Sequence, residues 1–347
     1  MPEKTLRSAA VTATAQPHRP FDMVCEGGGV KGIGLAGAYS VLEEQGYGAV
    51  NLAGTSAGAI TAALIAAGYS AVELEDIVLN EMRFRKFEDR TLVGRVPGLG
   101  LPLSVLVRNG YCKGDYFLHW MRDKLKHKGV RVFGDLARPS EDPKFGSRLQ
   151  VIASDLTTRQ LLVLPRDAKR ALGCAPEKLG VAEAVRMSMS IPLFFEPVQV
   201  HRHVIVDGGM LSNFPVWLFD RAGGKPPRWP TFGLKLVEPE SEQPVSKRMP
   251  RPVRAPRGIR GLTLLLSGML HTMLEAHDRM HIEEAQYART IGIPTLGVRT
   301  TAFDIGDELA RELYNSGRKA AAKFLADWDF AAYVAKYRGA GREAAAT

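Results

Sequence analysis

The chain has 347 residues, of which 45% are hydrophobic and 24% charged, so it can build a sizeable globular core. Its formal net charge of +9 suits a partner with a negative surface, either nucleic acid or anionic lipid. The three cysteines, Cys25, Cys112 and Cys174, are scattered and lack metal-ligand spacing, which argues against a disulfide framework and favours a cytoplasmic protein. Residues 1–19 show no signal-peptide pattern, and no run approaches the roughly 18 apolar residues of a membrane-spanning helix.

The predicted elements alternate between strand and helix from residue 21 onwards. A short apolar strand over 21–25 leads into a glycine loop and a helix over 33–45. A second strand over 50–53 is followed at once by a helix of small residues over 59–67. This order is typical of a parallel sheet with helices packed on its faces.

Capping residues and hydrophobic spacing predict the later elements. Ser70, with Glu73 placed for a capping box, begins a helix over 71–80, and Asp115 caps a helix over 116–127. The other predicted strands cover 149–153, 160–164, 198–206, 232–236 and 295–298, and the other helices cover 181–187, 262–286 and 307–328, with a shorter helix after them.

Three segments lack this periodicity. Residues 1–19 are interpreted as a flexible tail. Residues 81–115 interleave basic and aromatic side chains, which fits either a lid or mouth over an apolar pocket or a surface excursion packed on the body. Residues 240–260 are interpreted as an exposed basic loop, either a solvated linker or a surface for peripheral contact with an anionic membrane. Nucleic acid is not expected, because this loop lacks interleaved aromatic residues.

The motif Gly54-Thr55-Ser56-Ala57-Gly58 stands between a predicted strand and a predicted helix. A G-x-S-x-G turn holds its serine in a strained backbone that exposes Oγ at the end of the sheet. The positive end of the following helix points at this serine, where negative charge develops during acyl transfer. Ser56 is therefore a candidate nucleophile.

Two further motifs also follow predicted strands. The backbone N–H groups of Gly27 to Val30 are donors that no Cβ obstructs, and Asp207 emerges from an apolar strand into Gly208-Gly209. In a parallel sheet, these groups and Ser56 would all lie at the carboxyl ends of strands, where α/β sheets place their ligands. A serine nucleophile needs such a base and such oxyanion donors.

Two alternative sites are weaker. The glycine loop also matches the dinucleotide fingerprint G-x-G-x-x-G, but the second strand ends at Ser56 without the acidic residue that would hold a ribose. His201 and His203, two apart on one predicted strand, and His277 with His281, one helical turn apart, could each form half of a metal site. No third ligand is evident, so we expect no metal and no other cofactor.

The three motifs, in this order and together with Asn213-Phe214-Pro215, resemble the bacterial type of the patatin-like phospholipase family over about residues 21–215. The resemblance implies an α/β fold, a three-layer α/β/α sandwich with a mostly parallel central sheet. We assign this domain to residues 20–300, with residues 301–347 forming C-terminal helices packed on it and a tail.

The resemblance also implies hydrolysis of acyl esters in lipids by a Ser–Asp dyad without a metal. Carried over by position, Ser56 is the nucleophile, Asp207 the base, and Gly28 and Gly29 the oxyanion donors. The remaining motif positions are Gly27, Lys31, Gly32, Gly54, Gly58, Gly208 and Gly209.

An aspartate base raises a question of pKa, because a free aspartate has a pKa near 3.9, poorly matched to taking a serine proton at neutral pH. A Ser-Asp-His order would need His271, His277 or His281. Burial beside the apolar strand before Asp207 would instead raise the pKa of that carboxyl, and we expect no histidine to be essential.

The leading hypothesis is a cytoplasmic lipid acyl hydrolase, either free or peripherally attached to a membrane, acting on a phospholipid or another acyl lipid through an acyl-enzyme on Ser56. One alternative is a non-lipid esterase or thioesterase. The other is a lipid- or membrane-binding regulator with vestigial activity, against which the intact motifs argue.

Overall fold

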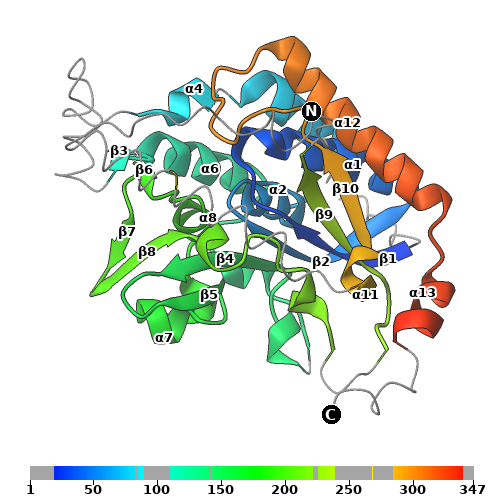
Figure 1. Ribbon diagram of the computed structural model, residues 1–347. Coiled ribbons are helices and arrows are strands. Elements are labelled where there is room, and N and C mark those ends of the chain that lie inside the picture. Colours follow the sequence, from blue (N-terminus) through cyan, green and yellow to red (C-terminus); the bar gives the residue numbers. More distant parts are fainter. Residues whose placement is uncertain are drawn as a thin grey trace, which may run out of the picture.

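The computed structural model describes residues 19–82, 84–89, 110–140, 142–221, 226–238, 268 and 284–338. Its centre is an 8-stranded sheet in the order β10-β9-β1-β2-β4-β8-β7, with β5 paired to β4 (Figure 1). The strands are β1 (Arg19–Cys25), β2 (Tyr47–Thr55), β4 (Leu149–Asp155), β5 (Gln160–Leu164), β7 (Val198–Val200), β8 (His203–Asp207), β9 (Thr231–Val237) and β10 (Thr290–Pro294).

The sheet is mostly parallel, as predicted. β10, β9, β1, β2 and β4 run parallel to one another, whereas β5 and β8 pair antiparallel with β4, and β7 pairs antiparallel with β8. The single strand predicted over 198–206 is wrong: the chain turns at His201, whose φ is +52°, and forms the antiparallel hairpin β7–β8. The closing strand predicted over 295–298 is also wrong, because Leu296 and Gly297 have positive φ and form a turn after β10.

Helices cover both faces of the sheet in a three-layer α/β/α arrangement (Figure 1). The larger core cluster lies where α1 (Ile33–Glu44), α2 (Ala57–Ala66) and α8 (Val181–Ser188) pack on the strands. On the opposite face, a smaller apolar cluster of Val24, Ala53, Ile152, Val163, Leu218 and Phe219 includes two residues of the 3-10 turn η8 (Val216–Phe219).

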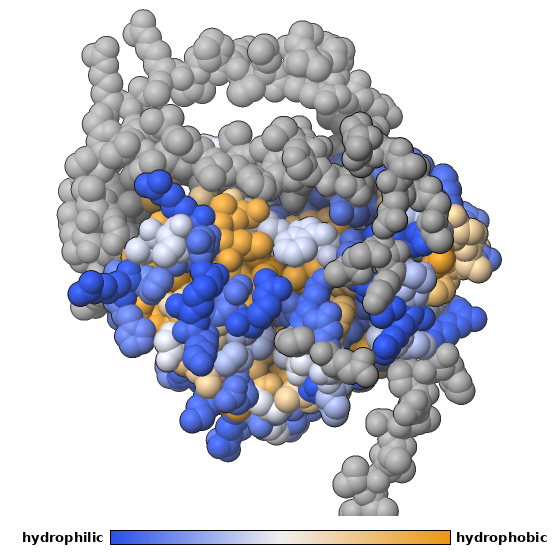
Figure 2. All heavy atoms as spheres, turned by 90° about the horizontal axis from the view of Figure 1, so that it is seen from below, coloured by the Kyte–Doolittle hydropathy of each residue, from blue (hydrophilic) through white to orange (hydrophobic). Residues whose placement is uncertain are grey.

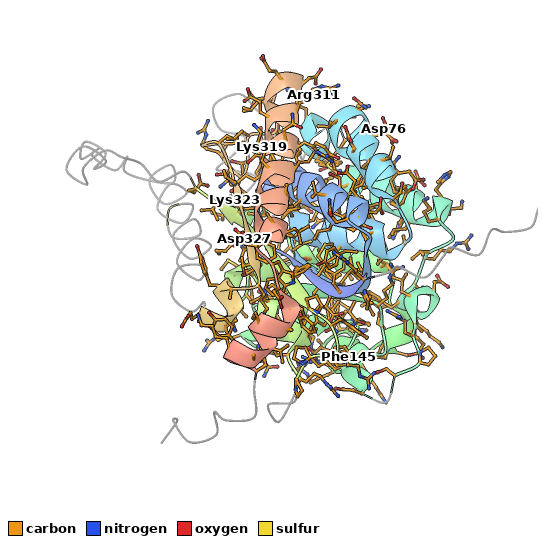
Figure 3. All side chains as sticks on the ribbon, turned by 90° about the vertical axis from the view of Figure 1, so that its right-hand side faces the viewer. Asp76, Phe145, Arg311, Lys319, Lys323 and Asp327 are labelled. Carbon is orange, nitrogen blue, oxygen red and sulfur yellow. The ribbon has the colours of Figure 1, made fainter. Side chains whose placement is uncertain are left out.

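The long helix α12 (Asp307–Ala326) packs on α1 and β10. The two helices approach closely at glycines: a Cβ added to Gly37 would collide with the carbonyl of Tyr314, and one added to Gly317 with the carbonyl of Gly34. The opposite side of α12 carries charged side chains, among them Arg311, Lys319 and Lys323 (Figure 3). α12 is therefore amphipathic, with its small residues against α1.

The predicted capping box is present: Ser70 and Glu73 exchange hydrogen bonds at the start of α3 (Ala71–Asp76), which continues as a π-helix over Ile77–Glu81. The predicted cap at Asp115 is wrong. Asp115 is the first residue of α6 (Asp115–His127), and the carboxylate of Asp89 instead accepts the N–H of Gly114 (2.7 Å) and of Tyr116 (3.0 Å). An acid 25 residues upstream of Gly114 thus caps the helix.

The remaining helices and strands are short or lie near the C-terminus of the described chain. They are α4 (Phe84–Phe87), β3 (Gly110–Cys112), α7 (Ala168–Leu172), β6 (Leu193–Phe195), α11 (Glu284–Tyr287) and α13 (Phe330–Tyr337). Outside the described residues lie nearly all of the predicted tail, much of the predicted lid, the predicted basic loop, and most of the predicted helix over 262–286 with His271, His277 and His281.

Candidate active site

Ser56 occupies the sharp turn between β2 and α2. Its backbone has φ +52° and ψ −123°, a conformation that costs a non-glycine residue about 1–3 kcal/mol and concentrates at functional sites. The flanking glycines are required by space: a Cβ on Gly54 would collide with the carbonyl of Gly58, and a Cβ on Gly58 with the carbonyl of Cys25. The G-x-S-x-G motif therefore forms the strained strand–turn–helix that the sequence predicts.

Asp207 is the last residue of β8 and is almost completely buried. Its Oδ1 accepts the N–H of Gly209 at 2.7 Å. Its Oδ2 is buried and accepts no well-formed hydrogen bond within the described chain. The Ser56 hydroxyl is nevertheless close enough to lower the pKa of Asp207, so the two groups face each other without a well-formed hydrogen bond in this conformation.

Burial is the largest influence on the Asp207 carboxyl and raises its pKa to about 6. The neighbouring Ser56 hydroxyl and the N–H of Gly209 oppose this shift but do not cancel it. A carboxylate with a pKa near 6 is much better matched to proton transfer at neutral pH than a free aspartate. The pKa shift therefore has the direction that a base without histidine requires.

The Ser56 and Asp207 motifs converge because of how β4 is paired. Thr55 at the end of β2 pairs with Ile152, and Asp207 at the end of β8 pairs with the next residue, Ala153. β5 pairs with both of these β4 residues on the other side, so β2 and β8 share one edge of β4. The expectation that Asp207 ends a parallel strand is wrong: β8 runs antiparallel, and its end meets the end of β2 along that shared edge.

The glycine loop follows β1 and runs into the short 3-10 turn η1 (Gly29–Gly32). Two N–H groups of this loop donate hydrogen bonds to backbone carbonyls: that of Gly27 to Asn213 (3.2 Å) and that of Val30 to Thr300 (3.1 Å). Within the described residues, the N–H groups of Gly28 and Gly29 donate no backbone hydrogen bond. Neither N–H group is therefore engaged by another backbone carbonyl of the described chain.

Space requires glycine at several positions of this loop. Gly29 has φ +56°, and a Cβ there would collide with the carbonyl of Thr300. A Cβ on Gly27 would collide with Oδ1 of Asn213, whose Nδ2 donates to the carbonyl of Gly27 at 3.1 Å. Gly32 allows the loop to approach Ala57 at the start of α2. The loop is thus packed against the segment after Asp207 and against the nucleophile turn.

Lys31 lies in the glycine motif, but its ammonium pairs with Glu238 beyond β9. Next to the loop, the buried Glu26 binds Lys235 (2.8 Å) and accepts the N–H of Leu236. These charge-assisted contacts fasten the loop to β9. Gly208 is needed because a Cβ there would collide with the carbonyl of Ile152, and Gly209 supplies the N–H that holds Asp207.

The structure separates the histidine pair considered as half of a metal site. His201 lies in the β7–β8 turn, while His203 begins β8 and places Nδ1 2.7 Å from Oδ2 of Asp155. Neither is among the groups that affect the pKa of Asp207. Within the described residues, no group of three potential ligands could hold a metal ion.

The sequence analysis missed several residues that contact the site. Ser188, at the end of α8, accepts the N–H of Ser56 at 2.9 Å, and the carbonyl of Ser190 accepts the N–H of Asp207 at 3.0 Å. Glu26 and Thr300 were also missed. The sequence did offer a signal for Ser188 and Ser190: both serines stand at the end of a predicted helix, directly before Ile191-Pro192.

Comparison with known proteins agrees with this site. A sequence model of the patatin-like phospholipase family matches residues 23–220, more than half of the chain. The chain is 39% identical to YqhO of Bacillus subtilis over 318 residues, which is 89% of this chain and 99% of YqhO. It is 29% identical over 200 residues to the NTE family protein Mb2594 of Mycobacterium bovis, covering 57% of this chain and 27% of that protein.

The fold has a counterpart among solved structures. The crystal structure of VipD from Legionella pneumophila matches 90% of this chain and 67% of VipD with a TM-score of 0.52, at 18% sequence identity. The match of the family model to more than half of the chain shows that this protein belongs to the patatin-like phospholipase family, which supports a hydrolase that acts on lipids. No helix within the described residues is long and apolar enough to cross a membrane.

Proposed function

We propose that this protein is a lipid acyl hydrolase of the phospholipase A type, which cleaves carboxylic esters through a Ser56–Asp207 dyad and an acyl-enzyme. The observation that carries the proposal is the buried carboxylate of Asp207, with an unpartnered Oδ2, facing a strained serine at the end of β2. A buried acceptor without a donor is costly, and a serine proton arriving in the reaction would satisfy it.

In the proposed reaction, ionised Asp207 takes the proton of Ser56 as Oγ attacks the ester carbonyl. The tetrahedral intermediate places its negative oxygen at the N–H groups of Gly28 and Gly29, at the start of η1. Asp207 then gives the proton to the departing alcohol, leaving the acyl group on Ser56. Water, deprotonated by the same carboxylate, then attacks the acyl carbonyl; the fatty acid is released and Asp207 returns the proton to Oγ of Ser56.

A lipid substrate is favoured by the family and by exposed apolar side chains on segments that follow Asp207 and at or after the ends of β9 and β10. Leu211 lies two residues after Gly209, and Leu296 lies in the turn before Thr300; they are 37% and 44% exposed. Trp217 and Val237 are each 40% exposed on neighbouring segments. Apolar patches among hydrophilic side chains are also visible on the face seen in Figure 2.

Peripheral contact with an anionic membrane is part of the proposal, because these apolar side chains accompany a net charge of +9. Binding to anionic and neutral vesicles at two salt concentrations tests it. We expect tighter binding to the anionic vesicles and weakening by salt, whereas equal binding to both would remove the electrostatic contribution.

Lipid product analysis tests the reaction. Wild type should release fatty acid from phospholipid vesicles, and Ser56→Ala and Asp207→Ala should not. A chain-length series of p-nitrophenyl esters distinguishes a lipase-like preference from a short-chain esterase. Vesicle binding without turnover by wild type would instead favour a lipid-binding regulator.

A further inference from the structure

The C-terminal turn of α8 contacts both members of the proposed dyad through the backbone. Oγ of Ser188 accepts the N–H of Ser56 (2.9 Å), and two residues later the carbonyl of Ser190 accepts the N–H of Asp207 (3.0 Å). Ser188 and Ser190 are themselves fully buried. Two hydrogen bonds from one short turn therefore hold the nucleophile and the base at a fixed separation.

The bond to Ser56 has a specific physical task. Ser56 precedes α2, so its N–H has no carbonyl acceptor inside that helix, and burial denies it water. Its strained backbone persists only where the surroundings determine it. Ser188 both satisfies the buried N–H and opposes rotation of the peptide that orients Oγ.

The buried guanidinium of Arg186 anchors this turn at the end of α8. This group donates to Oγ of Ser190 (2.5 Å), to the carbonyl of Glu196 (3.0 Å) and to that of Lys113, and it lies over the ring of Phe195. The hydroxyl of Ser190 also donates to the carbonyl of Arg186 (2.8 Å). These contacts tie the α8 turn to the segments around it.

We propose that Ser188 is a positioning residue for Ser56, and that the turn from Ser188 to Ser190, anchored by Arg186, sets the spacing between nucleophile and base. The inference rests on the proposed function, since the spacing matters only if the two groups carry out acyl transfer. Ser188 acts through the backbone of Ser56 and does not contact the substrate.

Ser188→Ala removes the acceptor, and Ser188→Cys keeps the volume while offering only a weak acceptor. Ser316→Ala is the matched control, because Ser316 is a buried helical serine on α12 whose hydroxyl bonds the carbonyl of Pro294 (2.7 Å). We expect both Ser188 variants to lower kcat, and the rate at which a fluorophosphonate labels Ser56, by about ten- to a hundredfold. KM and the acid limb of the pH profile should stay unchanged, because the pocket and the burial of Asp207 are intact.

Amide hydrogen exchange at Ser56, followed by NMR, tests the contact independently of turnover. Its protection should fall in both Ser188 variants and remain in Ser316→Ala. If wild type neither hydrolyses esters nor reacts with the phosphonate, the proposed function fails while the exchange experiment still tests the contact. Wild-type kcat and a protected Ser56 amide in Ser188→Ala, or an equal loss of activity in Ser316→Ala, would overturn the inference. If Ser188→Ala does not fold, Ser188→Cys decides by the same criteria.

Discussion

Ser56 and Asp207 approach each other along one edge of β4 from strands that run in opposite directions. β2 ends opposite Ile152 and turns into α2, and Asp207 then takes the adjacent pairing position opposite Ala153. The carboxyl ends of both strands thus meet at consecutive residues of a third strand. This arrangement brings a hydroxyl and a buried carboxylate together without any loop to position either of them.

Two substitutions of Ser56 distinguish its role in the reaction from the strain of its backbone. Ser56→Ala and Ser56→Gly should both abolish hydrolysis, but Ser56→Gly should be about 1 kcal/mol more stable than Ser56→Ala, because glycine adopts φ +52° without steric cost. Urea unfolding of the two variants, with equal m-values, measures the difference. Equal stability of the two would mean that the turn is unstrained.

The raised pKa of Asp207 predicts the pH dependence of activity. The base works only when ionised, so kcat/KM should rise with pH through about 6 and level off above pH 7. Ester hydrolysis measured between pH 4 and 9 checks this, with Ser316→Ala as a reference. An acid limb near pH 4 would show that burial does not control this carboxyl.

The raised pKa of Asp207 also predicts that the protein loses stability as pH rises, although its activity increases. The folded state holds the Asp207 proton up to about pH 6, whereas the unfolded chain releases it near pH 4, so wild type loses stability as pH rises between these values. Asp207→Asn lacks this loss and should be about 1–3 kcal/mol more stable than wild type at pH 7.5. At pH 4 the advantage should shrink. Thermal unfolding at both pH values provides the comparison, and an advantage independent of pH would point to packing.

Substitution of Gly28 tests the proposed oxyanion loop without requiring a change of φ at this residue. Its φ of −177° is accessible to any residue, and among the described residues an added Cβ would collide with the side chain of Leu236 alone. Gly28→Ala should therefore fold but displace the loop and lower kcat about tenfold or more.

Gly28→Ala combined with Leu236→Ala should recover part of the lost activity, with Leu236→Ala alone as the reference. The double variant relieves the collision while leaving the N–H of residue 28 in place. Unchanged kcat in Gly28→Ala, or no recovery in the double variant, would contradict the role of this loop as the oxyanion site.

Histidine should be dispensable for the reaction. His203 is held by Asp155, and burial already adjusts the pKa of Asp207. Single replacement of His271, His277 and His281 by Ala should keep hydrolysis within about tenfold of wild type, a small loss beside that expected from removing a catalytic base. A loss of about a thousandfold at one of them would indicate a Ser-Asp-His triad.

Much of the fold could be predicted because its signals are local. Glycines around Ser56, the apolar strands and the Ser70–Glu73 capping box depend on residues close together in the chain, and the structure contains each of them. The β7–β8 hairpin was missed because a continuous alternating pattern conceals a turn at His201. The cap of α6 was misassigned because Asp89, outside the helix, performs it.

The sequence by itself determined the chemical groups: a serine in a turn that only glycines can flank, an aspartate after an apolar strand, and a glycine loop with accessible N–H groups. Only the tertiary structure decided that β8 runs antiparallel and that burial raises the pKa of Asp207 to about 6. It also decided that Ser188 and Ser190 accept the backbone N–H groups of Ser56 and Asp207. The reason is physical: backbone strain and small-residue requirements arise from neighbours in the chain, whereas desolvation and strand pairing depend on which distant segments pack together.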